Sequence, residues 1–452
     1  MSARAAAPIV ILGGGLSGMA AAHALARSGC SDVTIVERGP RLGGLAGSFQ
    51  HEGHFYPLGY HHVLHRDRTL LYVLDAIGAL PEIRWRRVRM LFRLGGTLHE
   101  LGSPLGFLRF PMSLADKARF ARLMLRAFRK SDWTDWLDAS AAELVDGWAG
   151  PGVRAAIFEP LVQLRFERSC EEISGAWLGT RLHFREGSAP LGYQPGANWT
   201  TTLCDGYQAL LETLGVGIRL GSPLRALTTV DGAVREAVLE SGERIAGERF
   251  VSTLPAEVYT SLAPDDASPQ LGEIRYTAMI SVVCATRHRV EPDFYWMNLA
   301  SLDHTACGIF LLSSLNPTIG APDTTCVNFV THLRGRESPL FARSDTELLA
   351  AYCEDYQRIF GVDLDPFWYR VSRVPMYAPA FVRGYRNPPV RSASHSNLYF
   401  AGNYCSHPSV ASTGTAMASG FLAARALLRD MDADTDLPEA VAAFRLGSMP
   451  RP

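Results

Sequence analysis

Residues 9–18 read IVILGGGLSG, a short apolar run followed at once by a glycine-rich turn. A continuous run of four aliphatic residues is typical of a strand that is buried on both faces of a parallel sheet. The alanine-rich stretch Met19–Arg27 that follows contains no helix breaker, and Asp32–Glu37 returns to the pattern of a strand. This order of strand, turn, helix and strand predicts a βαβ unit and an α/β fold.

The three spaced glycines of the turn follow the pattern G-x-G-x-x-G. In that pattern Gly13 permits a tight turn, Gly15 lets the backbone approach a pyrophosphate, and Gly18 lets the helix pack closely on the strand. The backbone N–H groups of Leu16 and Ser17, at the start of the helix, then face the anion. The motif alone also fits a purely structural turn, but the complete order of elements favours binding of a dinucleotide.

Glu37 ends the second predicted strand, where a carboxylate accepts the hydrogen bonds of a ribose diol. The following residues, 38–47, read RGPRLGGLAG and contain a second glycine pair. Gly43 and Gly44 supply further backbone N–H groups near a pyrophosphate, and Arg41 can neutralise its charge. A second anion-binding turn suits a long cofactor laid across the domain, which favours FAD over NAD.

These N-terminal motifs resemble the FAD signature of the clan that contains amine oxidases, protoporphyrinogen oxidases and phytoene desaturases. Residues 397–403, NLYFAGN, resemble the strand and turn of that clan that meet the flavin, and residues 413–420, TGTAMASG, resemble its flavin-facing helix. The start of such a helix carries partial positive charge, which favours reduced flavin. The chain departs from the clan at Asn403 and Thr415, where an acid and a glycine are usual.

The resemblance covers most of the chain and implies noncovalent FAD in a Rossmann-like domain of the glutathione-reductase type, with an inserted α+β substrate domain. Cys405, close to the C-terminal motif, leaves a covalent flavin thioether as the less favoured alternative. The motifs and the resemblance together give this set of cofactor-binding residues: Gly13, Gly15, Leu16, Ser17, Gly18, Glu37, Arg38, Arg41, Gly43, Gly44, Gly59, Tyr60, Leu224, Thr253, Gly402, Asn403, Thr413, Gly414, Thr415 and Ala416.

The rest of the pattern divides the chain between these two domains. Helical patterning dominates 67–185, short alternating strands over 217–253 indicate an antiparallel meander, and 275–331 reads mostly as strands. The predicted division is a first part of the FAD-binding domain at 1–80, a mainly helical substrate-domain insert at 81–200, a second FAD-binding part at 201–260, a substrate-domain sheet and helix at 261–375, a C-terminal FAD-binding part at 376–430 and a tail at 431–452.

Residues 59–62, GYHH, match the segment of the clan that passes over the isoalloxazine ring. A histidine there can hydrogen-bond the flavin or move a proton near neutral pH, so His61 and His62 are candidate catalytic residues. A structural histidine bonded to the backbone is the alternative, and the sequence does not separate the two residues. Tyr377 is a third candidate, because it precedes the C-terminal motif where the related fold delivers side chains to the substrate side of the flavin.

Two arginines four residues apart, Arg181 and Arg185, resemble the place where UDP-galactopyranose mutases of the same fold bind the pyrophosphate of their substrate. On a helix both guanidinium groups face one side, and their planar forks suit phosphate or carboxylate. Surface salt bridges are the commoner use of such a pair. Tyr385 is a further candidate for substrate contact, with a tyrosine that completes the core as the alternative.

The chain has 452 residues, and its 44 Lys and Arg nearly balance its 45 Asp and Glu, which gives no general attraction to nucleic acid. The eight cysteines are scattered, so we expect neither a disulfide framework nor a metal site. With no secretory signal and no long apolar run, we expect a cytoplasmic protein. A basic amphipathic stretch at 107–130 fits a solvated bundle helix better than a face resting on an anionic membrane, which stays the alternative.

The only lysines, Lys117 and Lys130, stand far from every flavin motif in the sequence. Many amine-oxidising members of the clan place a lysine beside the flavin N5, so this pattern favours desaturation of a C–C or C–N bond, with hydride transfer from a small-molecule substrate to N5. The electron acceptor, oxygen or another molecule, and the oligomeric state are left open. A mutase that acts on a nucleotide sugar from reduced flavin is one alternative, and a noncatalytic protein stabilised by FAD is another.

Overall fold

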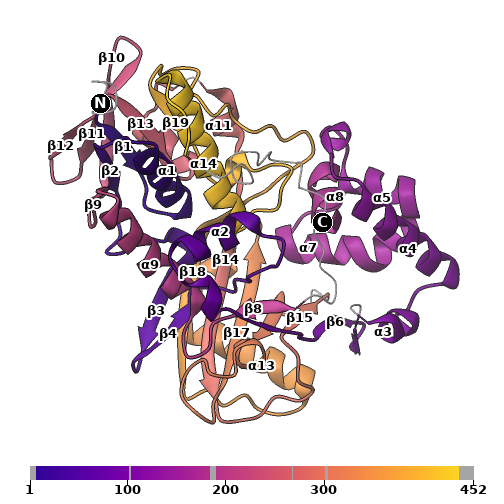
Figure 1. Ribbon diagram of the computed structural model, residues 1–452. Coiled ribbons are helices and arrows are strands. Elements are labelled where there is room, and N and C mark those ends of the chain that lie inside the picture. Colours follow the sequence, from indigo (N-terminus) through magenta and orange to yellow (C-terminus); the bar gives the residue numbers. More distant parts are fainter. Residues whose placement is uncertain (1–6, 101–102, 184–189, 267, 301–303, 437–452) are drawn as a thin grey trace.

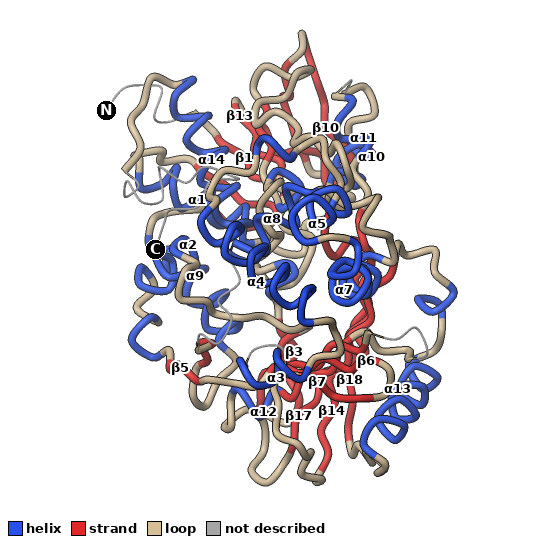
Figure 2. The backbone as a smooth tube through the Cα atoms, turned by 90° about the vertical axis from the view of Figure 1, so that its right-hand side faces the viewer, coloured by secondary structure: helices blue, strands red, loops and turns tan. Residues whose placement is uncertain are grey.

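The computed structural model describes residues 7–100, 103–183, 190–266, 268–300 and 304–436 (Figure 1). Three parts are recognisable: a parallel sheet with its helices, a larger mixed sheet, and a group of helices beside both. Figure 2 shows the helical group facing the viewer, between the parallel sheet above and the mixed sheet below. The α/β fold class predicted from the sequence is confirmed.

The parallel sheet has five strands, and every neighbouring pair in it is parallel. Strand β1 lies at its centre and is completely buried, as the apolar run of residues 9–12 predicts. In spatial order the strands are β19 (Leu398–Phe400), β13 (Arg249–Ser252), β1 (Ile9–Leu12), β2 (Val33–Val36) and β9 (Gly217–Arg219). Segments from the start, the middle and the end of the chain therefore build one sheet.

Helices α1 (Leu16–Arg27) and α14 (Thr413–Asp430) lie side by side against this sheet. They approach so closely that a Cβ atom at Gly420 would lie 2.0 Å from the carbonyl oxygen of Ser17. The Ser17 hydroxyl also donates a hydrogen bond to the carbonyl of Ala416 (2.8 Å). The contact joins the two ends of the chain, and it is flanked by α2 (Arg68–Ala76) and α9 (Trp199–Thr213).

The segment 217–253, predicted as one antiparallel meander, divides between two sheets. Its middle forms a three-stranded antiparallel sheet of β10 (Leu224–Val230), β11 (Ala233–Leu239) and β12 (Arg244–Ala246). Its two ends, β9 and β13, pair with β2 and β1 of the parallel sheet. The meander prediction is wrong for β9, because its partner β2 lies more than a hundred residues away and strand pattern alone does not reveal it.

The mixed sheet has seven strands, with β15 and β6 parallel and the other pairs antiparallel. Helix α13 (Asp345–Phe360), capped by Ser344, packs Leu348, Tyr352 and Tyr356 on one face of it. In spatial order the strands are β18 (Trp368–Pro379), β14 (Tyr276–Thr286), β17 (Thr325–Leu333), β16 (Gly308–Leu311), β15 (Trp296–Leu299), β6 (Met90–Leu94) and β7 (Thr97–His99).

Strands β6 and β7 come from the segment 67–185, where helical patterning dominates the sequence. They are short: β6 pairs with β15, which lies about two hundred residues further along the chain, and β7 pairs with β6. The same region also contributes β5 (Arg84–Arg86), which pairs with β8 (Leu191–Tyr193). These strands interrupt a segment that is otherwise mostly helical, as its pattern predicts.

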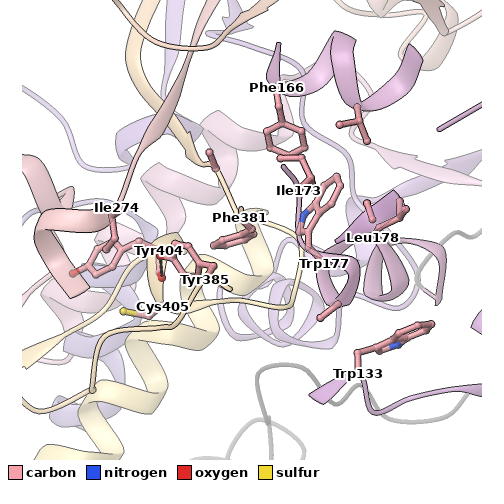
Figure 3. Close-up of a cluster of buried hydrophobic side chains, with 14 of the residues drawn as sticks. Trp133, Phe166, Ile173, Trp177, Leu178, Ile274, Phe381, Tyr385, Tyr404 and Cys405 are labelled. Carbon is pink, nitrogen blue, oxygen red and sulfur yellow. Dashed lines mark hydrogen bonds between the residues drawn. The ribbon is translucent and has the colours of Figure 1, made fainter. Parts of the chain in front are cut away.

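The helical group packs around aromatic side chains, part of which Figure 3 shows. Gly179 lies against Trp133 so closely that a Cβ atom would be 2.1 Å from the indole ring. The helices are α3 (Pro104–Arg109), α4 (Leu114–Arg129), α5 (Ala141–Ala149), α6 (Pro151–Val153), α7 (Glu159–Phe166) and α8 (Gly175–His183), with a π-helical turn at Arg154–Phe158. Helix α7 extends from this group to β17 of the mixed sheet.

The remaining elements are short. They are β3 (Ser48–His51), β4 (His54–Pro57), α10 (Ala256–Leu262), α11 (Pro269–Glu273), α12 (Leu312–Leu315) and the 3-10 turns Gly44–Ala46, Leu80–Glu82, Thr134–Trp136, Pro339–Ala342 and Asn403–Cys405. Within the described ranges, no helix combines the length and the hydropathy that a membrane span requires. The same ranges hold no group of three His, Cys, Asp or Glu side chains placed to bind a metal ion.

Candidate functional site

A cavity of about 1390 Å³ lies where the three parts of the molecule meet. Its wall at one end is made by the glycine-rich turns of the parallel sheet and the start of α14. Its wall at the other end is made by α7, α8 and strands of the mixed sheet. We call these the nucleotide end and the substrate end.

At the nucleotide end, Gly13, Gly15, Leu16 and Ser17 line the cavity. Gly15 is the N-cap of α1 and offers no side-chain oxygen to the first turn of the helix. A Cβ atom at Gly15 would meet no protein atom within 4 Å. Gly18 does not line the cavity, since a Cβ atom there would lie 2.1 Å from the Gly13 carbonyl oxygen. Uncapped N–H groups and open space beside Gly15 form a cradle for an anion.

The carboxylate of Glu37 is held at this wall by two backbone donors. It accepts hydrogen bonds from the N–H groups of Gly14 and Gly39, each at 2.7 Å. Arg41 also lines the cavity, but it forms an ion pair with Asp205, so its charge is already partly compensated. The expected role of Arg41 against a pyrophosphate is therefore weaker than the sequence suggests.

Nearly the whole predicted set of cofactor-binding residues lines this one cavity. The exceptions are Gly18 and Gly59; a Cβ atom at Gly59 would lie 3.0 Å from the Met279 methyl carbon. The members that line the cavity are Gly13, Gly15, Leu16, Ser17, Glu37, Arg38, Arg41, Gly43, Gly44, Tyr60, Leu224, Thr253, Gly402, Asn403, Thr413, Gly414, Thr415 and Ala416. Motifs four hundred residues apart in the sequence thus meet around a single space.

The two positions at which the chain departs from the clan contact each other. Thr415 Oγ1 lies 3.2 Å from Asn403 Oδ1 and 2.9 Å from the Val410 carbonyl oxygen. The Thr415 hydroxyl also accepts a hydrogen bond from the Ser412 N–H (2.8 Å), and Ser412 caps the backbone of Thr415 in return. This reciprocal cap fixes the start of α14 at the cavity wall.

His61 and His62 both line the substrate end. The His61 Nε2 donates to the Leu45 carbonyl (3.1 Å), and burial lowers the pKa of His61. The His62 Nδ1 lies 3.1 Å from the Tyr295 hydroxyl, and burial, aided by the charges of neighbouring groups, lowers the pKa of His62 to about 3. A proton shuttle that changes charge near neutral pH is therefore excluded for His62. Its buried Nε2 has no partner among the described residues.

Arg165, on α7, is the main site residue that was not identified from the sequence. Its Nη1 donates to the Tyr60 hydroxyl (2.8 Å) and to His332 Nε2 (3.0 Å), and its guanidinium lies 5.2 Å from the centre of the Tyr377 ring. Tyr60 in turn stacks on Phe310, with 4.0 Å between ring centres. All five side chains line the substrate end. The signal that could have identified it is an arginine among the apolar residues of a predicted helix, at residues 161–166.

The structure places the three residues predicted to contact substrate in different surroundings. Arg181, on α8, lines the cavity and lies over the Trp177 ring at 5.8 Å. Arg185 lies outside the described residues. Tyr385 does not line the cavity: its hydroxyl donates to the Tyr404 carbonyl (2.6 Å), and its ring packs on Phe381 (Figure 3). The assignment of Tyr385 to substrate is wrong, because it completes the core.

Cys405 lies in the same cluster as Tyr385 and is buried (Figure 3). Its thiol does not line the cavity, and burial raises its pKa, so a thioether to the flavin has no geometric support. Neither lysine lines the cavity: Lys117 donates to the Leu108 carbonyl, and Lys130 pairs with Asp135.

The basic stretch at 107–130 forms α3 and α4. Helix α4 buries Phe120, Leu123 and Ala127 against the helical group, as expected of a bundle helix. Large apolar side chains on the outer side of α3 and α4 are nevertheless exposed, namely Leu105, Leu108, Leu114, Leu125 and Phe128.

Residues 16–428 match the family described as flavin containing amine oxidoreductase. The chain belongs to this family. It is therefore an FAD-dependent oxidoreductase, and the resemblance inferred from the sequence is confirmed. The cradle beside Gly15 and the uncapped start of α1 fit an anionic group such as the pyrophosphate of FAD, and the carboxylate of Glu37 lies at the same wall of the cavity.

Among curated proteins, the chain is similar to the 15-cis-phytoene desaturase of Solanum lycopersicum, with 22% identity over 94% of this chain and 78% of the relative. It is also similar to the protoporphyrinogen oxidase of Bos taurus, with 26% identity over 61% of this chain and 65% of the relative. Among solved structures, reduced UDP-galactopyranose mutase superposes with a TM-score of 0.72 over 94% of both chains. Its sequence identity is 15%, so this likeness shows the fold alone.

Proposed function

We propose that this enzyme removes a hydride from a C–H bond of a small molecule and so desaturates a C–C or C–N bond. The observation that carries the proposal is the composition of the substrate end, where aromatic side chains, neutral histidines and arginines meet without a lysine or a carboxylate in the described part of the wall. FAD, when bound, supplies the acceptor of the hydride at N5. The proton lost from the neighbouring atom passes to solvent.

Backbone groups of the nucleotide end would hold the cofactor. We assign the pyrophosphate to the glycine turns at Gly13–Gly15 and Gly43–Gly44 and the ribose diol to Glu37, following the signature of the family. The start of α14, at Thr413, would lie near the isoalloxazine, where its partial positive charge stabilises the reduced state.

Side chains of the substrate end would orient the reacting molecule. Tyr60, Phe310 and Trp296 form a stacked apolar wall, with ring centres 4.0 Å and 5.2 Å apart, that excludes water and suits a flat or extended body. We assign hydrogen bonding to His62, whose Nε2 is unpartnered among the described residues, and to Tyr377. Neither assignment requires a change of charge.

The names of the curated relatives, a desaturase and a protoporphyrinogen oxidase, support oxidation of carbon-based substrates over the mutase alternative. The likeness to UDP-galactopyranose mutase, at 15% sequence identity, is one of fold. The mutase is therefore not favoured.

The test is anaerobic mixing of the purified holoprotein with reduced tetrapyrroles, polyenes, reduced rings and amines while the flavin band is followed. Bleaching by one of the first three classes, with an unsaturated product, is the expected result. Readmission of air then distinguishes an oxidase, which recovers its colour fast, from an enzyme that uses another acceptor. Turnover of a nucleotide sugar that requires reductant without consuming it would overturn the proposal.

For its location we propose the cytoplasm, with peripheral contact to a membrane. The exposed apolar side chains of α3 and α4 would make the contact, and they adjoin the cavity because Arg66, which lines it, lies 5.4 Å from the Phe128 ring. Cosedimentation with vesicles of phosphatidylserine and phosphatidylcholine tests the proposal. Binding that a paired Leu114→Ser and Leu125→Ser variant loses would support it, and absence of binding at low salt would contradict it.

A further inference from the structure

Arg165 carries a positive charge into the substrate end of the cavity without a carboxylate to balance it. Within the described ranges, no ion pair joins it to an Asp or a Glu, and the groups that act on its pKa are Tyr60 and Tyr377. Its side-chain partners Tyr60, His332 and Tyr377 are all neutral, and the bonds to Tyr60 and His332 both leave from Nη1. A guanidinium has five N–H donors and keeps its proton in proteins, so donors remain for an acceptor in the cavity.

The charged side chains that line the cavity also make its substrate end positive. The acidic side chains that line it are Glu37 and Glu240, beside the strands that form the nucleotide end, and Asp67, which caps α2 next to Gly414. The substrate end holds Arg165 and Arg181. Arg38 and Arg41 accompany Glu37 at the nucleotide end, whereas none of the three acidic side chains in the described lining belongs to the substrate end, which is therefore positive.

His332 gives a second, independent observation. It is 6% exposed, and burial, followed by the charges of Arg165 and Arg181, lowers its pKa well below the ordinary value. Because Nε2 accepts the hydrogen bond from Arg165, the proton of this neutral ring is on Nδ1. The buried Nδ1 has no partner among the described residues. A buried N–H donor without an acceptor costs free energy unless a ligand supplies one.

We infer that the substrate carries an oxyanion, a carboxylate or a phosphate, which binds against Arg165 beside the Nδ1–H of His332. This inference rests on the proposed function, because it names the chemical class of the molecule that is oxidised. The Tyr377 ring supports the guanidinium from one side, at 5.2 Å, and fixes its plane. The stacked wall of Tyr60, Phe310 and Trp296 takes the apolar body. The substrate is thus an apolar molecule with an anionic group at one end.

The experiment uses the oxidised holoprotein and three probes that share one aromatic body. The probes are 1-naphthoate, 1-naphthyl phosphate and the neutral 1-naphthamide, and binding is followed by perturbation of the flavin spectrum and by calorimetry. We expect at least one of the two anions to bind roughly tenfold to a hundredfold more tightly than the amide. Which anion binds better distinguishes a carboxylate substrate from a phosphate substrate. Equal binding of all three probes, or no binding of either anion, would overturn the inference.

Two variants assign the preference to Arg165. Arg165→Gln should abolish the preference for the anions, and Arg165→Lys should keep part of it, because the charge remains while the fork is lost. Arg289→Gln is the matched control, since this arginine is 87% exposed and pairs with Glu291 on the surface. Should the Gln variant lose its flavin, the comparison of probes on the native protein still decides the question.

Two outcomes separate this inference from the proposed function. If substrates of the proposed kind bleach the flavin while the anions bind no better than the amide, only the oxyanion inference fails. If the anions bind selectively but no C–H donor bleaches the flavin, only the proposed reaction fails. A lower flavin potential in Arg165→Gln with unchanged anion binding would show that the guanidinium serves the cofactor, and it would overturn the inference.

Discussion

The nucleotide end and the substrate end of the cavity are built by different means. At the nucleotide end the groups that face the cavity are mostly backbone: glycine turns, the uncapped start of α1 and the fixed start of α14. At the substrate end they are side chains, such as Arg165, Tyr60 and His332, held by one another. A backbone site tolerates changes of side chain but not of glycine, whereas a side-chain site can change specificity residue by residue while the cofactor stays bound.

The largest effect is expected from breaking the backbone site. A paired Gly15→Val and Glu37→Ala variant fills the cradle and removes the carboxylate that stands where the ribose diol would bind, so FAD affinity should fall by at least about a hundredfold. The measurement is flavin absorbance per folded protein after desalting. Gly147→Ala, at a helical glycine with open space around it, is the control. Full retention of flavin in the pair would contradict the assigned site.

A change at the substrate end should leave the cofactor in place. Phe310→Ala removes the ring on which Tyr60 stacks, so we expect full flavin content but flavin reduction by substrate that is roughly tenfold to a hundredfold slower. Stopped-flow reduction measures this. Phe367→Ala, at a ring 49% exposed, is the matched control. Loss of flavin from the Phe310 variant would mean that the two ends are not separable.

The two ends also differ in how far the sequence predicts them. The βαβ unit and the glycine turns are local patterns in which each residue's role follows from its neighbours in the chain. The substrate end joins residues of β4–α2, α7, β16, β17 and β18, and no local pattern predicts that Arg165 meets His332. For the same reason the sequence does not predict that β6 pairs with the distant β15, or that Tyr385 packs in the core.

A buried histidine outside both ends makes stability depend on pH. Burial, and then the charge of Arg27, lowers the pKa of His23 from its ordinary value of 6.5 to about 4. The unfolded chain therefore binds more protons between these values, and stability is lost as the pH falls through this window. His23→Gln should reduce the slope by up to about 1.4 kcal/mol per pH unit there. Urea unfolding of both proteins across this range measures it, and equal slopes would contradict the assignment.

The smallest effect is expected where the chain departs from its family. Thr415→Ala removes the reciprocal cap with Ser412 and the contact with Asn403, so we expect a loss of about 1 kcal/mol in the free energy of unfolding, with flavin retained. Thr213→Ala, whose hydroxyl bonds the Ala209 carbonyl on an exposed helix turn, provides the comparison. A large loss of flavin would show that Thr415 contacts the cofactor directly rather than through the helix start.

The close crossing of α1 and α14 at Ser17 and Gly420 has a consequence for biosynthesis. Strand β19 and helix α14 are among the last described elements to be made, yet they complete the sheet of β1 and wall the cradle at Gly15. A nascent chain that ends before residue 398 lacks this wall, whatever the state of its N-terminal motif. FAD can thus be enclosed only after β19 and α14 have been synthesised. In a truncated product the glycine turns that bind the cofactor would be exposed to solvent.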